Sequence, residues 1–173
     1  PGFEGLEVPE RMIDFAGLQA EENEHIYAWV YIPNTNIDYP VLQHPEEADY
    51  YLSHDTKGNK VTAGSIFTQY YNNKDFNDNN TVIYGHNMKD GQMFGRLYVL
   101  LNYKERFERA EIVIATLDGI YTYKVFSGYR TTTEYYYIDT DFSSDAEYLA
   151  FLEDIKKKSV IKSDMELSVS DRI

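Results

Sequence analysis

The chain contains 173 residues, of which 43% are hydrophobic and 16% aromatic, a composition typical of a single globular domain with a sizeable core. It has 16 Lys and Arg residues against 29 Asp and Glu, so its net charge is -13 and a nucleic-acid partner would be repelled. The absence of cysteine excludes disulfides, thiolate metal sites and a cysteine nucleophile within these residues.

The N-terminal segment is predicted to be a helix at residues 9–24 that packs on the outside of the main body. Pro9 suits the first turn of a helix, and Met12 and Phe15 contribute to a weak apolar face. We therefore expect residues 1–27 to form a helical extension.

Short β-type runs replace the helical pattern from residue 28 onward. Turn residues separate them, including Pro33-Asn34 and an Asn-rich stretch between residues 72 and 80. The expected strands are 28–32, 37–42, 64–68 and 81–84. Many short strands with turns between them are typical of an antiparallel-rich barrel that is closed or nearly closed, so residues 28–173 are predicted to form a mainly β domain.

A β-hairpin is predicted at residues 111–129. Two β-type runs, 111–117 and 120–129, flank the dipeptide Asp118-Gly119. This dipeptide supplies the positive φ angles that a two-residue type I′ turn requires.

A second helix is predicted at residues 145–158. Ser144 and Glu147 form a capping-box pattern at its start, and the lysines at 156–158 complement the helix dipole at its end. Residues 167–173 then have the pattern of a strand that stops midway, which predicts a β-barrel domain that is incomplete at its C-terminus.

No metal site is expected in this sequence. The stretch Asp75 to Asn80 imitates the opening of a calcium loop, but Asn80 replaces the glycine of the sharp turn, and His86 stands where a bidentate glutamate belongs. The remaining histidines lack the ligand spacing of a zinc site; they are His25, His44 and His54.

His86 is the strongest candidate for a functional residue. It follows the apolar run 81–84 and Gly85 and precedes the loop 87–91, the usual place for a catalytic group on a rigid scaffold. The 17 tyrosines could line a peptide groove, but tyrosine also suits half-buried strands with one wet end, and we favour that interpretation.

A series of motifs in order along the chain resembles the sortase family. The motifs are Trp29 to Val41, Tyr50 to Leu52, Gly64 to Phe67, Asn80 to Asn87 and Met93 to Gly95. The resemblance covers nearly the whole chain from Ala28, and the two predicted helices are similar to those of the class B branch. It implies an eight-stranded, sortase-like β-barrel with added helices, and it implies a cysteine transpeptidase.

The resemblance also implies roles for individual residues. Sortase chemistry needs a thiolate to attack the scissile carbonyl, an imidazolium to protonate the departing amine, and donors to hold the oxyanion. His86 matches the family histidine, while Tyr84 and Leu52 match positions that line the sorting-signal groove, although either could equally be core. The family cysteine and arginine are expected after Ile173, so Arg172 is not the family arginine and these 173 residues are expected to be inactive.

Partners and location follow from the same resemblance. The enzyme would cut a C-terminal sorting signal of a surface protein and join it to an amine of the cell wall or of a pilus subunit, without a cofactor. It would work at the outer face of a Gram-positive membrane, held by an N-terminal anchor outside this chain. Two alternatives stay open: a non-catalytic sortase-like surface module that binds peptide or wall components, and a metal-dependent hydrolase built on His86.

Overall fold

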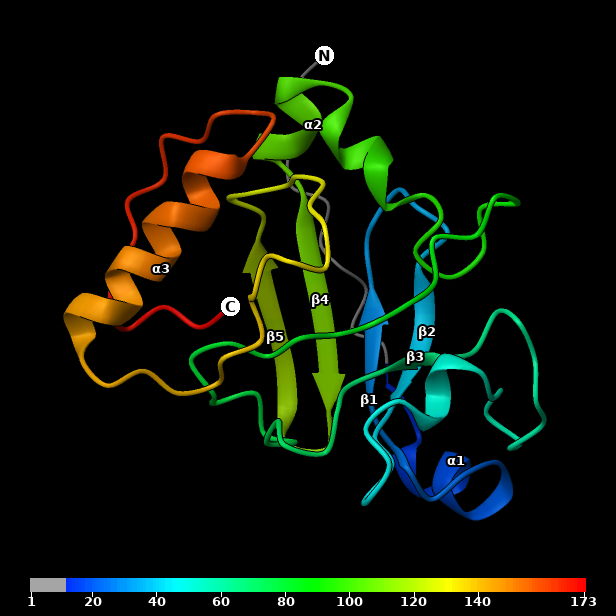
Figure 1. Cartoon of the computed structure of the whole chain (residues 1–173). Coiled ribbons are helices and arrows are strands. Elements are labelled where there is room, and N and C mark those ends of the chain that lie inside the picture. Colours follow the sequence, from blue (N-terminus) through cyan, green and yellow to red (C-terminus); the bar gives the residue numbers. More distant parts are fainter. Residues whose placement is uncertain (1–11) are drawn as a thin grey trace.

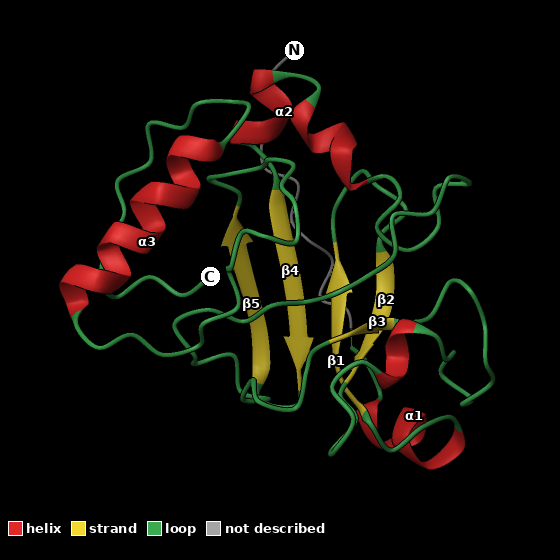
Figure 2. Ribbon diagram, in the orientation of Figure 1, coloured by secondary structure: helices red, strands yellow, loops and turns green. Residues whose placement is uncertain are grey.

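The computed structural model describes residues 12–173 and contains a five-stranded sheet flanked by helices (Figures 1 and 2). The strands are β1 (Ile26–Tyr31), β2 (Asp38–Leu42), β3 (Ile66–Phe67), β4 (Glu111–Thr116) and β5 (Gly119–Lys124). The α-helices are α1 (Phe15–Glu21), α2 (Lys104–Glu108) and α3 (Asp145–Lys158). Two 3-10 helices lie between them, η1 (Tyr50–Leu52) and η2 (Leu97–Leu101).

The strands follow the order β3-β2-β1-β4-β5 across the sheet. Neighbouring strands are antiparallel except β2 and β3, which are parallel. The central strand β1 is almost entirely buried, whereas the edge strand β5 is mostly exposed. Helix α3 lies beyond β5, and α1 lies at the other side of the molecule, near the start of β1 (Figure 1).

The sheet is not closed within the described residues, which corrects the expectation of a closed or nearly closed barrel. The run 81–84 forms only an isolated pair with β3, between Tyr84 and Phe67. The strand expected at 167–173 does not form, and only Ile173 exchanges backbone hydrogen bonds with the run before Tyr84. Because a barrel closes only when every strand pairs on both sides, these short contacts leave β3 and β5 as the sheet edges.

Two buried clusters pack against the sheet and support its central strands. One contains Val30, Val41 and Ile114, and it forms the main core. The other joins Phe15 of α1 to Phe67 of β3, together with Ile26, Leu42 and Tyr51. Burial of such apolar side chains is the dominant favourable term in folding. The second cluster lies beneath Tyr84, so it forms a rigid base for the segment that leads to His86.

The N-terminal helix is shorter than the sequence pattern predicts. Helix α1 begins at Phe15 because the Asp14 carboxylate caps it, accepting a hydrogen bond from the backbone N–H of Gly17 at 2.9 Å. It ends at Glu21 rather than at residue 24. The predicted start at Pro9 lies outside the described residues, and the division of the chain after residue 27 stays a prediction.

The predicted hairpin is confirmed, but its turn is not of the predicted type. Thr116 pairs with Gly119, so the loop consists of Leu117 and Asp118, and neither has a positive φ angle. The Asp118 N–H instead donates to the Thr116 side-chain oxygen at 3.2 Å, a local bond that a type I′ turn does not need. Strand β5 also ends earlier than predicted, at Lys124.

Helix α3 spans the predicted residues 145–158, and its buried face contains Tyr148, Leu152 and Ile155. The Ser144 side chain accepts a hydrogen bond from the Glu147 N–H at 3.2 Å, as an N-cap residue does. The Glu147 carboxylate accepts a hydrogen bond from the backbone N–H of Ser143, at 2.7 Å, rather than from that of Ser144.

Replacing Ser144 by alanine is expected to lower the free energy of unfolding by about 1 kcal/mol, because one N–H of the first turn of α3 loses its partner. Urea unfolding of the two proteins measures the difference. An unchanged unfolding midpoint would mean that the hydrogen bonds that Ser143 donates to the Glu147 carboxylate are sufficient to hold this end of the helix.

Candidate functional site

The backbone before His86 is held by close packing on both sides. Tyr84 exchanges two backbone hydrogen bonds with Phe67 of β3, at 2.7 and 3.1 Å. Gly85 has no room for a side chain, since a Cβ atom there would lie 2.7 Å from the ring of Phe94. The position before His86 therefore needs glycine, and the resulting backbone path sets the direction from which His86 enters the site.

The side chain of His86 meets the backbone of η1. Its Nε2 atom lies 2.8 Å from the carbonyl oxygen of Leu52, and because a carbonyl can only accept, Nε2 carries the proton. Leu52 itself is 43% exposed, so its side chain is not part of the core. The structure thus brings together two of the residues singled out in the sequence, although they lie 34 positions apart.

The loop after His86 is closed on itself and tied to the body of the protein. Its two ends pair at Asn87 and Met93, and the N–H of Phe94 donates to the His86 carbonyl at 2.9 Å. The side chain of Asn36 donates to the Gly91 carbonyl at 2.7 Å. These bonds leave the loop little freedom, so His86 lies between two constrained segments.

Tyr84 lies between the apolar base and a polar network. Its ring stacks on Phe67, with centroids 5.3 Å apart, and its hydroxyl donates to the side-chain oxygen of Gln69 at 3.1 Å. Burial raises the pKa of Tyr84 well above its ordinary value, and the neighbouring Tyr71 hydroxyl raises it further. Tyr84 is therefore a neutral hydroxyl group and not a proton acceptor at neutral pH.

Gln69 was not singled out in the sequence, yet it organises this network. Its side-chain oxygen accepts hydrogen bonds from Tyr84 and Tyr71, and its amide donates to the Asp49 carboxylate at 2.7 Å. A single glutamine has no sequence pattern of its own.

Asn80 is a second residue whose contribution the sequence did not reveal. Its side chain is only 6% exposed and donates to the carbonyls of Tyr137 at 2.7 Å and Asp139 at 3.0 Å. These bonds attach the long connection between β5 and α3 to the segment before Tyr84. Such a contact spans more than 50 residues, so no local pattern could predict it.

The remaining residues weighed in the sequence make structural contacts. Asp78 of the Asn-rich loop accepts hydrogen bonds from the side chains of Asn72 and Asn73. Arg172 donates to the backbone carbonyls of Asn77 and Asp171. Within residues 12–173, no group of three or more histidine or acidic side chains has the arrangement of a metal site. No helix in this range has the length and apolarity needed to cross a membrane.

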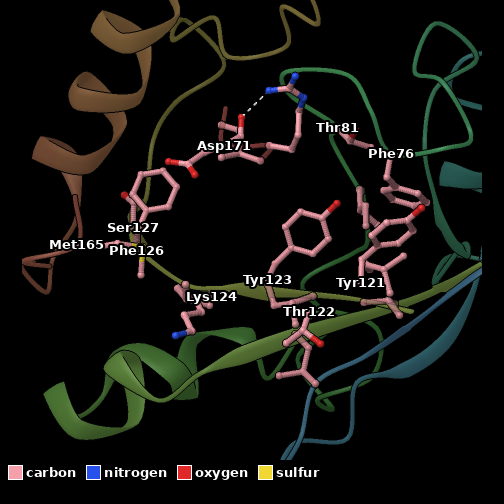
Figure 3. A pocket seen from close by; sticks show the side chains of 18 of the residues that line it. Phe76, Thr81, Tyr121, Thr122, Tyr123, Lys124, Phe126, Ser127, Met165 and Asp171 are labelled. Atoms are coloured by element: carbon pink, nitrogen blue, oxygen red, sulfur yellow. Dashed lines mark hydrogen bonds between the residues drawn. The ribbon is translucent and has the colours of Figure 1, made fainter. Parts of the chain in front are cut away.

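A cavity of about 740 Å³ lies apart from His86 (Figure 3). It is bounded by β5, by residues of the 76–83 segment and by the last residues of the chain. The ring of Tyr123 projects into it, and Tyr121 lies beside Phe76, with ring centroids 6.5 Å apart. His86, Tyr84 and Leu52 do not line this space, whereas their neighbours Ile83 and Phe94 do.

Comparisons with known proteins give a consistent result. A family model described as a sortase domain matches residues 30–162. The chain is 42% identical over 153 residues to sortase B of Listeria monocytogenes, and 39% identical over 154 residues to sortase B of Staphylococcus aureus. These alignments cover 87% of this chain but only 61% and 62% of the two relatives, so the chain spans about three fifths of their length.

Solved structures of similar proteins share the fold. A sortase B from Bacillus anthracis in complex with AAEK1 superimposes with a TM-score of 0.82 at 43% identity, covering 91% of this chain and 73% of that one. A sortase B–substrate complex from Staphylococcus aureus gives a TM-score of 0.84 at 37% identity, covering 91% and 72%.

Proposed function

The chain belongs to the sortase family, and from this premise we propose that the intact protein is a class B-like transpeptidase that cleaves a C-terminal sorting signal and transfers the new acyl end to an amine. The observation that carries the proposal is the geometry of His86. It follows a strand-like segment, its backbone is constrained on both sides, and its Nε2–H is bound by the Leu52 carbonyl.

The hydrogen bond to Leu52 assigns the two nitrogens of His86 different tasks. With Nε2 donating to the carbonyl, Nδ1 is the nitrogen that exchanges a proton. As an imidazolium, His86 protonates the amine that leaves when a thiolate attacks the scissile carbonyl, and a thioacyl enzyme results. Neutral His86 then takes a proton from the incoming amine as the amine attacks the thioester, and the cysteine leaves as a thiolate, so the thiolate and imidazolium of the first step are restored.

The nucleophile of this reaction is a cysteine, and these 173 residues contain none. We place it, with the family arginine, among residues of the intact protein that follow Ile173, and we expect the chain as given to be inactive. Ile173 supports this placement, because its N–H donates to the Asn79 carbonyl at 3.1 Å and its carbonyl accepts from the Thr81 N–H at 2.6 Å. In a parallel strand pair, a residue bonds to the two residues that flank its partner on the other strand. Ile173 bonds in this way to Asn79 and Thr81, so its partner is Asn80.

We propose that a strand following Ile173 continues the register of this pair. His86 lies six residues after Asn80, so continued parallel pairing brings the sixth residue after Ile173 alongside His86. The same added strand would lie beside the cavity next to β5, whose edge is exposed.

The sorting signal would bind as an extended peptide beside η1. Leu52 offers exposed apolar surface, and Tyr84 offers a half-buried ring held by Gln69, so both are proposed to line the groove. The partners would be surface proteins and an amine of the cell wall or a pilus subunit. The protein would act at the outer face of the membrane of a Gram-positive cell, held there by an N-terminal segment outside this chain.

Cleavage of quenched fluorescent pentapeptides of sorting-signal type, by the intact protein and by the 173-residue chain side by side, tests the proposal. We expect cleavage by the intact protein alone, and we expect a thiol alkylator to block it. Cleavage by the 173-residue chain would exclude the cysteine mechanism. Peptide binding without cleavage by the intact protein would favour the non-catalytic surface module.

A further inference from the structure

The carbonyl groups of five consecutive residues, 50–54, each accept a hydrogen bond. Three of these bonds come from residues 61–65: Tyr51 O accepts from Ser65 N, Ser53 O from Val61 N and His54 O from Ser65 Oγ. A fourth lies within the segment, where Tyr50 O accepts from His54 Nδ1. The fifth, the Leu52 carbonyl, accepts from His86. Four bonds thus fix the η1 turn, and one carbonyl of that fixed turn is directed to the candidate catalytic residue.

His54 makes the bond that closes the turn on itself. Its Nδ1 lies 2.7 Å from the Tyr50 carbonyl, four residues back, whereas the backbone bond from Ser53 N–H to the same carbonyl is long, at 3.4 Å. The shorter bond is the stronger closure of the turn. The His54 ring also stacks on the Tyr50 ring, with centroids 4.1 Å apart and planes 6° from parallel.

Gly64 packs against the other side of this turn. Its φ angle is +57°, and a Cβ atom there would lie 2.5 Å from the carbonyl oxygens of both Leu52 and Tyr51. The Leu52 carbonyl therefore has no free space on that side. Its direction is restrained further by the closure of the turn from Tyr50 to His54, and a loosened turn would let it rotate away from His86.

We infer that His54 is a positioning residue for His86: by closing the η1 turn through the Tyr50 carbonyl, it holds the Leu52 carbonyl where it selects the Nε2–H form of His86. The expected effect on catalysis rests on the proposed function, whereas the effect on the protonated form of His86 does not. The selected form leaves Nδ1 free to exchange protons with the reacting groups. Loss of the closure lets the neutral imidazole populate both forms, and the wrong form has no lone pair at Nδ1.

Two substitutions separate the hydrogen bond of His54 from its stacking. His54→Phe keeps a ring against Tyr50 and removes the donor, whereas His54→Asn keeps a donor at the same branch and removes the ring. His44→Ala is the matched control. The His44 ring also stacks on Tyr50, with centroids 4.6 Å apart, but its Nδ1 accepts from the backbone N–H groups of Glu46 and Glu47 and makes no bond to the turn.

The first measurement is the long-range ¹H–¹⁵N spectrum of the His86 imidazole at alkaline pH. The native protein and His54→Asn are expected to show the Nε2–H form, and His54→Phe a mixture of both forms. In the intact enzyme, His54→Phe is expected to lower kcat about tenfold with KM changed less than about twofold. His54→Asn should restore most of kcat, and His44→Ala should leave it unchanged.

Three results would overturn the inference: a native His86 that carries its proton mainly on Nδ1, a His54→Phe protein with the native spectrum and kcat, or an equal loss in His44→Ala. The spectrum needs no catalysis. If the intact protein cleaves no peptide, the proposed function fails, while the spectrum still decides whether His54 positions His86.

Discussion

Replacing His86 by alanine in the intact protein is expected to lower kcat/KM for a sorting-signal peptide by roughly 10²- to 10⁴-fold, the range that a positioned general acid and base contributes. The reason is geometric. The imidazole stands on a constrained backbone and is bound at Nε2 by Leu52, and no other side chain named in the candidate site can deliver a proton at that place. Steady-state cleavage of a fluorescent peptide measures the effect.

Folding of the His86→Ala protein should change little, because His86 is partly exposed and water can replace it as the donor to the Leu52 carbonyl. Thermal unfolding beside the native protein checks this point. His44→Ala is the matched control, since it removes another partly exposed histidine, whose ring nitrogen accepts hydrogen bonds from the backbone N–H groups of Glu46 and Glu47. A His86→Ala enzyme with native kcat/KM would refute the assignment of His86.

Replacing Gly95 by alanine is expected to destabilise the protein by about 1–3 kcal/mol, the usual cost of forcing an extra group into packed structure. A Cβ atom at Gly95 would lie 2.2 Å from the Met88 carbonyl oxygen and 2.9 Å from that of Gln92. Both contacts are with backbone, so the loop after His86 must move. Because Phe94 N–H bonds to the His86 carbonyl, the movement should also lower kcat.

Gly17→Ala is the matched control for this prediction. There the added methyl group meets only the side chain of Asp14, which can move, and alanine favours the helix. Its effect on the free energy of unfolding should stay within about 1 kcal/mol. Urea unfolding of both variants compares them, and a Gly95→Ala protein as stable as Gly17→Ala would show that the loop is not tightly packed.

Local patterns predicted much of this fold. Helix α3 has the boundaries that Ser144 and the terminal lysines indicate, since caps and charges act over one turn. Strands β1 and β2 and the β4–β5 hairpin lie within one or two residues of their expected positions at most ends. The predicted turn type was wrong. Asp118-Gly119 is a strong local signal for a type I′ turn, but the pairing of Thr116 with Gly119 makes Leu117 and Asp118 the two loop residues instead.

The sheet closure and the site depended on contacts that no local pattern contains. A strand-like run such as 81–84 can be recognised, but its partner cannot, and it makes only one pair with β3. His86 was found because a strand followed by a loop is a local signal. The partners that give it chemical meaning, the Leu52 carbonyl and the turn closed by His54, lie more than 30 residues away and act partly through backbone atoms.

The central claim is a thioacyl intermediate, and the mass of the intact protein during turnover of a cleavable sorting-signal peptide tests it most directly. The account predicts a covalent increment equal to the N-terminal fragment of the peptide, removed by an amine acceptor that is recovered joined to that fragment. Cleavage with no increment and no transfer to the amine would contradict it.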